Sequence, residues 1–333
     1  MAVLYIKEQG AYVEKRGERV LVEKNKKILL DLPVASVENM ALIGNVQMTI
    51  QMLHYLMEHG VDISYFSFGG KYLGHSCAES SRNIFLRLAQ YRQYNDLEKR
   101  IAMAKVIVEN KINNQIALIK HFRWTGIEYD WHKDVQELKT QKKHLADAKT
   151  ANQILGIEGF CSSIYFKAYG KIFKCKFSFK GRNRRPPKDP INVILSLGYT
   201  FLTREVSEAL EAESFEMYLG FLHGIRYGRK SLALDIVEEF RQPVIDRLTL
   251  RLFNKKMLGE FHFEMEGDMV ALNEDGFQIF CKEYERWLTD KTFSNSDVNF
   301  RSQIKMQAAL LKKSIQSNES YIPFCWRCQN VCD

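Results

Sequence analysis

The pattern of apolar and polar positions changes character near residue 90 of this 333-residue chain. Before that point, short runs alternate between apolar and polar residues, which is the period of a half-buried strand. YVEKRGERVLVE (12–23) holds two such runs broken at Arg16-Gly17, as in a β-hairpin. ILLDLPVASVENMALIG (28–44) adds two more runs, separated near Pro33. The beginning of the chain therefore predicts repeated short strands.

One helix and one further pair of strands complete this region. VQMTIQMLHYLMEHG (46–60) has apolar residues three and four apart and ends at Gly60, a residue favoured just after a helix. VDISYFSF (61–68) predicts a strand that turns at Gly69-Gly70 into KYLGHS. We expect a small, mostly β N-terminal domain over residues 1–88.

Beyond this region the spacing becomes helical. Thr150 and Gln153 form a capping box that opens one helix, and Asp189-Pro190 is a typical start for another. Asp96 is the expected N-cap of a long helix over 96–122, whose apolar stripe has a period of three and four residues. That stripe consists of Ile101, Ala104, Val108, Ile112, Ile116 and Ile119.

The rest of the chain is also expected to be mostly helical. The polar stretch 127–149 predicts a solvated helix or a connector, and Pro243 should interrupt or kink the pattern around it. We therefore expect residues 89–333 to form a larger all-α domain. The predicted fold class is α+β, with this helical domain carrying any catalysis.

Composition and charge narrow the class of protein. Hydrophobic residues make up 46% of the chain, which is enough for a core. Lys and Arg number 48 against 40 Asp and Glu, and the net charge of +8 favours a polyanionic partner wherever it is clustered. No apolar run reaches the ~18 residues that span a bilayer, and the N-terminus lacks a signal peptide's apolar stretch. With an odd number of cysteines, seven, we expect a cytoplasmic protein with reduced thiols and no membrane partner.

The tail carries Cys325, Cys328 and Cys332 in a C-x2-C-x3-C spacing. A structural zinc site needs four ligands, so a fourth would have to come from Cys281, a histidine or another chain. A reduced tail without metal is the favoured interpretation, and the sequence assigns the tail no role.

Three polar residues stand in apolar segments with helical character: Glu158, His223 and Glu238. Burying such groups is costly unless something compensates them, and one divalent ion would compensate all three. Two carboxylates and an imidazole suit Mg²⁺ or, because of the nitrogen, Mn²⁺ somewhat better. The long spacings leave an alternative open, in which His223 is a hydrogen-bonded core residue and Glu238 a solubilising acid. Asp235 shares a face with Glu238, and we favour it as an orienting neighbour over a further ligand.

Positive charge gathers beside these residues in two clusters, one before the helix start at Asp189 and one after His223. Such groups hold DNA phosphates in a salt-dependent and weakly sequence-selective way. A solvated loop is the usual alternative, but two clusters flanking proposed ligands favour nucleic acid. The candidate DNA-binding residues are Lys180, Arg182, Arg184, Arg185, Lys188, Arg226, Arg229 and Lys230.

Several of these segments resemble one known family. The similarity is to CRISPR-associated protein one, the integrase of the CRISPR adaptation complex, and it extends over nearly the whole chain. VDISYFSFGGKYLG resembles that family's β-domain turn. Each motif is modest alone, whereas the set is specific. The other segments that carry the resemblance are GIEGFCSSIYF (156–166), RRPPKDPINVILSLGY (184–199), FLHGIRYGRKSLALDIVEEFRQPVIDRL (221–248) and the closing YIPF (321–324).

The resemblance implies an N-terminal β domain, a helical catalytic domain, and homodimers bridged in pairs by a small ferredoxin-like Cas partner. It implies metal-dependent transesterification, in which the 3′-hydroxyl of a captured double-stranded DNA fragment attacks a phosphodiester at the boundary of a repeat. Glu158, His223 and Glu238 match the family's metal ligands for Mg²⁺ or Mn²⁺, and Asp235 matches an acid that often accompanies them. Glu238 stands at a position where Asp is an alternative in the family. The three-cysteine tail departs from the pattern.

Two other functions stay open at this point. A standalone metal-dependent nuclease acting on branched DNA would use the same residues without a bridging partner. A catalytically silent DNA-binding scaffold would be expected to have lost at least one of the three. His223 is also a candidate general base. The sequence does not determine the CRISPR subtype, the motif that selects captured DNA, or the physiological metal.

Overall fold

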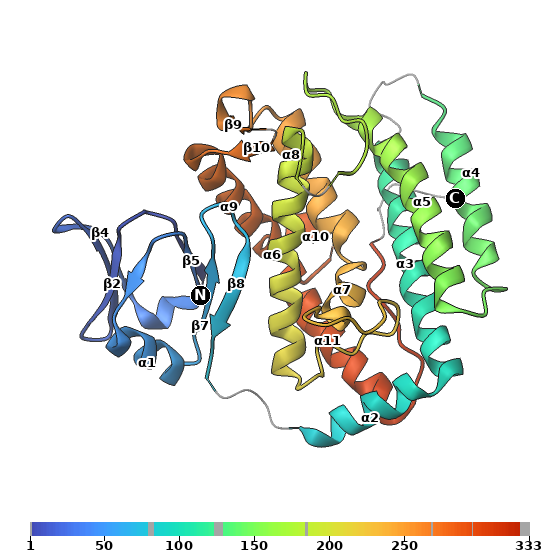
Figure 1. Ribbon diagram of the computed structural model, residues 1–333, viewed down its shortest axis with the longest axis horizontal. Coiled ribbons are helices and arrows are strands. Elements are labelled where there is room, and N and C mark those ends of the chain that lie inside the picture. Colours follow the sequence, from blue (N-terminus) through green and yellow to red (C-terminus); the bar gives the residue numbers. More distant parts are fainter. Residues whose placement is uncertain are drawn as a thin grey trace. The chain divides into compact units, whose positions relative to one another are not determined.

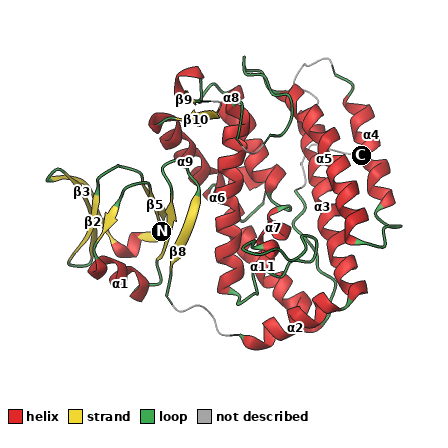
Figure 2. Ribbon diagram, viewed as in Figure 1, coloured by secondary structure: helices red, strands yellow, loops and turns green. Residues whose placement is uncertain are grey.

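The computed structural model describes residues 2–78, 83–122, 129–183, 186–267, 269–294 and 296–326. The chain divides into two compact units, Met1–Ser80 and Ser81–Asp333. Strands dominate the first unit and helices dominate the second (Figure 2). The predicted α+β class is therefore confirmed. The units divide at Ser80, so the expected boundary at residue 88 lies inside helix α2 (Ile84–Asn95) of the second unit.

The described part of the first unit holds two four-stranded sheets, ordered β1-β5-β7-β8 and β4-β3-β2-β6. In the first sheet β1, β5 and β7 are parallel and β8 is antiparallel to β7. Buried aliphatic side chains from both sheets and from helix α1 form one core. The bounds are β1 (Ala2–Ile6), β2 (Tyr12–Arg16), β3 (Arg19–Lys24), β4 (Lys27–Pro33), β5 (Val37–Ile43), β6 (Gln47–Met48), α1 (Ile50–Glu58), β7 (Asp62–Phe66) and β8 (Tyr72–Ser76).

The local signals predicted for this unit are confirmed. In the β2–β3 hairpin Arg16 pairs with Arg19, and the loop between them places Gly17 at φ +61°, where the absence of a Cβ removes the steric penalty. Helix α1 is followed by Gly60, which has φ +68°. The predicted strand and turn after Gly60 form β7 and β8.

The second unit is a set of helices in which α3 contacts α4 and α5, and α6 contacts α7 and α11. The same elements are seen in Figure 1. The predicted starts are confirmed: Asp96 accepts a hydrogen bond from the Lys99 amide at 3.1 Å, and Asp189 accepts one from the Asn192 amide at 2.9 Å. The bounds are α3 (Leu97–Phe122), α4 (Trp131–His144), α5 (Ala151–Ile172), α6 (Pro190–Ala212), α7 (Ser231–Val237), α8 (Arg247–Asn254), β9 (Phe263–Glu266), β10 (Met269–Leu272), α9 (Glu274–Thr289), α10 (Lys291–Ser294) and α11 (Phe300–Ser317).

Two expectations about this unit need correction. The stretch 127–149 contains α4, and the buried side chains of Trp131, Val135 and Leu138 show that one face packs against the core. The unit is also not entirely helical, because β9 and β10 form a small antiparallel sheet. Pro243 interrupts the helical pattern as predicted and lies in a π-helical turn, Arg241–Asp246, between α7 and α8. No helix within the described ranges has the length and apolar content required to cross a membrane.

Candidate active site

Glu158 lies on α5, at the wall of a pocket. The predicted capping box starts this helix, with the Gln153 amide donating to Thr150 Oγ1 at 3.3 Å. One turn after Glu158, the Ser162 hydroxyl donates a hydrogen bond to Glu158 Oε1 at 2.9 Å. The Glu158 side chain is 21% exposed, so the carboxylate faces the pocket and is less deeply placed than its apolar neighbours in the sequence suggest.

A lysine connects Glu158 to the second predicted acid. The Lys111 ammonium, from α3, contacts Glu158 Oε1 and lies 2.7 Å from Glu238 Oε2. The side chains of Lys111 and Glu238 are only 5% and 3% exposed. Taking such charges out of water costs several kcal/mol for each ion, so they are tolerated only with close opposite charge. Carboxylates from α5 and from the end of α7 therefore converge on one ammonium.

Glu238 is held as a carboxylate by two positive groups. Arg241 Nη1 lies 3.0 Å from Glu238 Oε1. Burial by itself raises the pKa of Glu238, but the charges of Arg241 and Lys111 outweigh it and lower the pKa to about 2. Each oxygen of this carboxylate therefore faces one cation, because Oε2 lies 2.7 Å from the Lys111 ammonium.

His223 is positioned by Asp235 and does not lie in a helix, contrary to prediction. It belongs to the connection 213–230 between α6 and α7. The backbone amides of Phe221, Leu222 and His223 all donate to the Asp235 carboxylate, at 2.5–3.0 Å. The carboxylate thus takes the place of the carbonyl groups that would accept these bonds in a helix. The His223 ring Nδ1 also lies 2.7 Å from Asp235 Oδ1. This leaves Nε2 as the ring nitrogen that can bind a metal.

The tight turn around Asp235 requires a glycine. A Cβ on Gly220 would come within 2.8 Å of Asp235 Oδ2 and within 2.7 Å of the Ser231 backbone. Asp235 is fully buried. All the contacts of its two carboxylate oxygens given above are to one segment, Phe221–His223. It therefore acts on His223 as an orienting group, in the way that carboxylates commonly support metal-binding histidines.

The donor set fits a divalent ion, but the three predicted residues do not form a closed cluster. Within the part of the chain that the structure describes, no three His, Cys, Asp or Glu side chains lie close enough to share an ion. Glu158 and Glu238 meet at Lys111, whereas His223 is held by Asp235. Lys111 occupies the space between the two acids. The carboxylate oxygens of Glu158 and Glu238 and the Nε2 atom of His223 are hard-oxygen and imidazole donors of the kind that Mg²⁺ or Mn²⁺ accepts.

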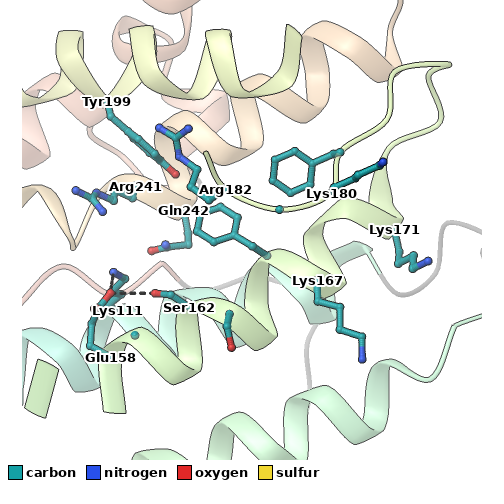
Figure 3. A pocket seen from close by; sticks show the side chains of 15 residues that line it. Lys111, Glu158, Ser162, Lys167, Lys171, Lys180, Arg182, Tyr199, Arg241 and Gln242 are labelled. Atoms are coloured by element: carbon teal, nitrogen blue, oxygen red, sulfur yellow. Dashed lines mark hydrogen bonds and ion pairs between the residues drawn. The ribbon is translucent and has the colours of Figure 1, made fainter. Parts of the chain in front are cut away.

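Glu158 borders a basic pocket of about 710 Å³ (Figure 3). Of the predicted DNA-binding residues, Lys180 and Arg182 line it. Arg182 is fixed there, because its guanidinium donates to Asn192 Oδ1 at 2.6 Å and to Ser196 at 3.0 Å. The other cationic side chains of the lining come from α3, α5 and the π-helical turn: Lys111, Lys167, Lys171 and Arg241.

Of the remaining predicted DNA-binding residues, the four that the structure describes do not line this pocket. Arg184 and Arg185 lie outside the described residues. Arg229 donates to the Gly224 carbonyl and closes its own loop, and Lys230 forms an ion pair with Glu211 at 2.7 Å. Lys188 and Arg226 are exposed and do not belong to the lining. The cluster after His223 therefore serves the local fold more than the pocket.

Sequence reasoning missed Lys111, Lys167 and Lys171. Lys111 belongs to a group of polar residues that interrupt the buried side of α3; the others are Asn110, Asn114 and Gln115. Their three- and four-residue spacing was a usable signal, because buried polar side chains are rare without a partner. Lys167 and Lys171, four residues apart on α5, look like ordinary surface lysines, and nothing in the sequence distinguishes them.

Tyr199 forms another wall of the pocket, and its position is fixed by the buried carboxyl group of Asp246. Its hydroxyl donates to Asp246 Oδ1 at 2.6 Å, and the Tyr165 hydroxyl donates to Asp246 Oδ2 at 2.6 Å. Burial raises the pKa of Asp246 to about 6, although these hydrogen bonds oppose the change. The guanidinium groups of Arg182 and Arg241 lie over the Tyr199 ring, 5.3 and 4.9 Å from its centroid.

The C-terminal segment, Tyr321–Trp326, docks beside Glu238. Glu239, which follows Glu238 in the sequence, accepts hydrogen bonds from the Tyr321 hydroxyl at 2.6 Å and from the Phe324 amide at 2.8 Å. Cys325 is exposed in this segment, and Cys281 is buried on α9. Cys328 and Cys332 lie outside the described residues, so the expectation of a reduced tail without metal stays a prediction.

Two acids and an imidazole beside a basic pocket are the arrangement of an enzyme that acts on phosphodiesters. The family model for CRISPR associated protein Cas1 matches residues 4–286, and the chain belongs to this family. It is 31% identical over 333 residues to CRISPR-associated endonuclease Cas1 3 of Thermus thermophilus, with 98% of each chain covered. This membership confirms the prediction of a metal-dependent integrase and endonuclease of CRISPR adaptation.

Solved structures agree with this placement. The Cas1 protein of Thermotoga maritima matches with a TM-score of 0.82 and 27% identity, over 95% of this chain and 97% of that one. At identities that indicate the fold alone, a casposase bound to integration product matches with a TM-score of 0.86 and 21% identity, over 100% of this chain and 96% of that one. A chain of a Cas6-RT-Cas1–Cas2 complex matches with a TM-score of 0.83 and 23% identity, over 98% of this chain and 36% of that one.

Proposed function

We propose that this protein joins the 3′-hydroxyl ends of captured DNA to the repeat array by transesterification, with Glu158, His223 and Glu238 holding Mg²⁺ or Mn²⁺. The observation that carries the proposal is the convergence of Glu158 and Glu238 on one ammonium, beside a histidine oriented by Asp235. When bound, a divalent ion polarises the scissile phosphate and lowers the pKa of an attacking hydroxyl. The lowered pKa of Glu238 keeps its carboxylate ionised, which is the form that can bind a metal ion.

The basic pocket supplies the contacts to DNA. Arg182 and Arg241 are held in fixed orientations by Asn192, Tyr199 and Glu238, and a fixed guanidinium is well suited to bidentate contact with a phosphate. Lys167, Lys171 and Lys180 are exposed at its rim and would hold the DNA backbone without reading its sequence.

We further propose that the working assembly contains a homodimer and a small ferredoxin-like Cas partner, and acts in the cytoplasm on double-stranded DNA. The solved complex whose title names Cas1 and Cas2 supports such a partner. A standalone nuclease on branched DNA would need no partner, so the presence or absence of the partner is the variable that separates the two functions.

The test is a strand-transfer assay on a supercoiled plasmid that carries a repeat, with Mn²⁺ or Mg²⁺, with and without the small partner. Glu158→Gln, His223→Ala and Glu238→Gln should each abolish strand transfer, while DNA binding, measured by fluorescence anisotropy, stays within about threefold. Activity retained in any of the three removes that residue from the site. Cleavage of branched DNA that is unaffected by the partner, without strand transfer, would favour the nuclease.

A further inference from the structure

Lys111 is a buried cation in a place where the proposed function requires a metal. Its side chain is 5% exposed, and its ammonium contacts carboxylates from two different helices. A fully buried lysine is rare unless it is paired. Here the pairing is double, and both partners are acids proposed as metal ligands. Two carboxylates this close, inside a protein, would repel each other strongly without a positive charge between them.

We propose that Lys111 is a built-in counter-ion that holds Glu158 and Glu238 in position when no metal is bound and moves away when a divalent ion enters. The inference rests on the proposed function. The ammonium contacts one oxygen of each acid, and a divalent ion bound between the acids would need those oxygens. Two cations at that spacing would also repel each other, so the ion and Lys111 compete for one position.

The surroundings provide a second position for the ammonium. Gln115 lies one turn further along α3, on the same side of the helix as Lys111, since residues four apart are neighbours. Gln115 is 1% exposed, and its Oε1 is buried and accepts no hydrogen bond from the described residues. A buried carbonyl oxygen without a donor is unfavourable. In this proposal the flexible four-carbon stem of lysine carries the ammonium to this acceptor by a change of rotamer.

Competition of this kind sets how tightly the site binds metal. Lys111 keeps the acids preorganised, so the carboxylates need not be gathered from separate positions when the ion arrives. The same ammonium lowers the net affinity, because each binding event must break two ion pairs. Lys111 is therefore a positioning residue, and its effect should appear in metal affinity independently of catalysis.

The experiment measures Mn²⁺ binding by isothermal titration calorimetry, without DNA, for the wild type and Lys111→Met. Methionine has a similar length and no charge. We expect Lys111→Met to bind Mn²⁺ at least about tenfold more tightly, and Mn²⁺ to raise its Tm by more than it raises the wild-type Tm. Lys105→Met is the matched control, because Lys105 lies on the same helix but donates to the Ala146 carbonyl at 2.7 Å; its Mn²⁺ affinity should be unchanged.

Lys111→Arg keeps the charge and covers the case in which Lys111→Met does not fold. A guanidinium pairs with carboxylates more strongly than an ammonium does, so Lys111→Arg should bind Mn²⁺ at least about tenfold more weakly. Unchanged or weaker affinity in folded Lys111→Met overturns the inference, as does unchanged affinity in Lys111→Arg when that is the only folded variant.

The proposed function is checked in the same titration. Glu158→Gln and His223→Ala should each weaken Mn²⁺ binding. If neither does, or if the wild type binds no Mn²⁺, the metal site itself is wrong and the inference falls with it. If both weaken binding but Lys111→Met does not tighten it, the proposed function stands and only the role given to Lys111 is wrong.

Discussion

At the scale of single residues, Asp235 is the side chain on which the geometry of the site depends most. It is fully buried, accepts three backbone amides and contacts the His223 ring. It thereby fixes both the path of the chain before α7 and the orientation of the imidazole. Lys111 plays a comparable part for the two glutamates. These buried polar groups are tolerated because each is closely matched by an opposite charge or a donor.

Asp235→Asn tests this orienting role. The amide keeps the size of the side chain but turns one of its acceptors into a donor, which then faces backbone N–H groups. We expect strand transfer and Mn²⁺ affinity to fall about 10–100-fold, as for other groups that support a metal-binding histidine. Denaturant unfolding should show a loss of about 1–3 kcal/mol. DNA affinity should change little, and a variant with wild-type Mn²⁺ affinity would show that Asp235 matters for the fold alone.

At the scale of elements, three segments meet at the site. Helix α3 brings Lys111, α5 brings Glu158, and the end of α7 brings Glu238. The C-terminal segment Tyr321–Trp326 binds next to this site. It donates hydrogen bonds to the carboxyl group of Glu239, the residue that follows Glu238. Asn114 of α3 also links the two segments, because it donates to the Glu239 backbone carbonyl at 2.9 Å and accepts from the Trp326 amide at 2.8 Å.

The docking of this segment should make stability depend on pH. Burial raises the pKa of Glu239 from 4.5 to about 8, although hydrogen bonds from Tyr321 and Phe324 oppose the change. Between these pH values the folded protein keeps a proton that the unfolded chain releases. The unfolded state then binds fewer protons, so the free energy of unfolding falls as the pH rises.

Glu239→Gln should remove that dependence and keep the hydrogen bonds. The Tyr321 hydroxyl oxygen also lies 2.9 Å from Gln307 Oε1. Its single proton can turn to that acceptor, so an amide at position 239 can donate to the phenol oxygen and accept from Phe324. Urea unfolding between pH 5 and 8 should show the variant gaining stability relative to the wild type as the pH rises. Glu319→Gln, an exposed acid near this segment, is the control and should leave the pH profile unchanged. Parallel profiles for Glu239→Gln and the wild type would contradict the expectation.

At the scale of the whole molecule, the net charge of +8 matters through its distribution. The pocket gathers cationic side chains from α3, α5, the loop before α6 and the π-helical turn, next to Glu158. Phosphate contacts of this kind release counterions, so the affinity for DNA should fall steeply with salt.

Lys167 and Lys171 allow this to be measured. Replacing both by Ala should lower the slope of log K against log salt concentration by about two, since each phosphate contact contributes about 0.9. Lys139→Ala with Lys143→Ala is the matched control: both are exposed and four residues apart on α4, away from the pocket lining. Filter binding at several salt concentrations gives both slopes, and an equal change in the two variants would show that the pocket is not the DNA surface.

Much of the fold was predictable because its signals are local. The Thr150 capping box, the Asp189-Pro190 start and the Gly17 turn each depend on a few neighbouring residues, and each was found where expected. The segment around His223 was not predictable. Its apolar spacing resembles a helix, but three amides prefer a carboxylate twelve or more residues further along the chain.

The sequence by itself determined the fold class, the positions of most helices and strands, and the family, because periodicity, capping and motif order are written in neighbouring residues. Only the tertiary structure decided that Lys111 stands between Glu158 and Glu238, that Asp235 orients His223, and that Lys167 and Lys171 border the pocket while Arg229 and Lys230 do not. Those contacts join segments that lie from 12 residues apart, for Asp235 and His223, to well over 100 residues apart, for Lys111 and Glu238. Charge pairing across such distances depends on how the helices pack, and a linear pattern carries no record of that.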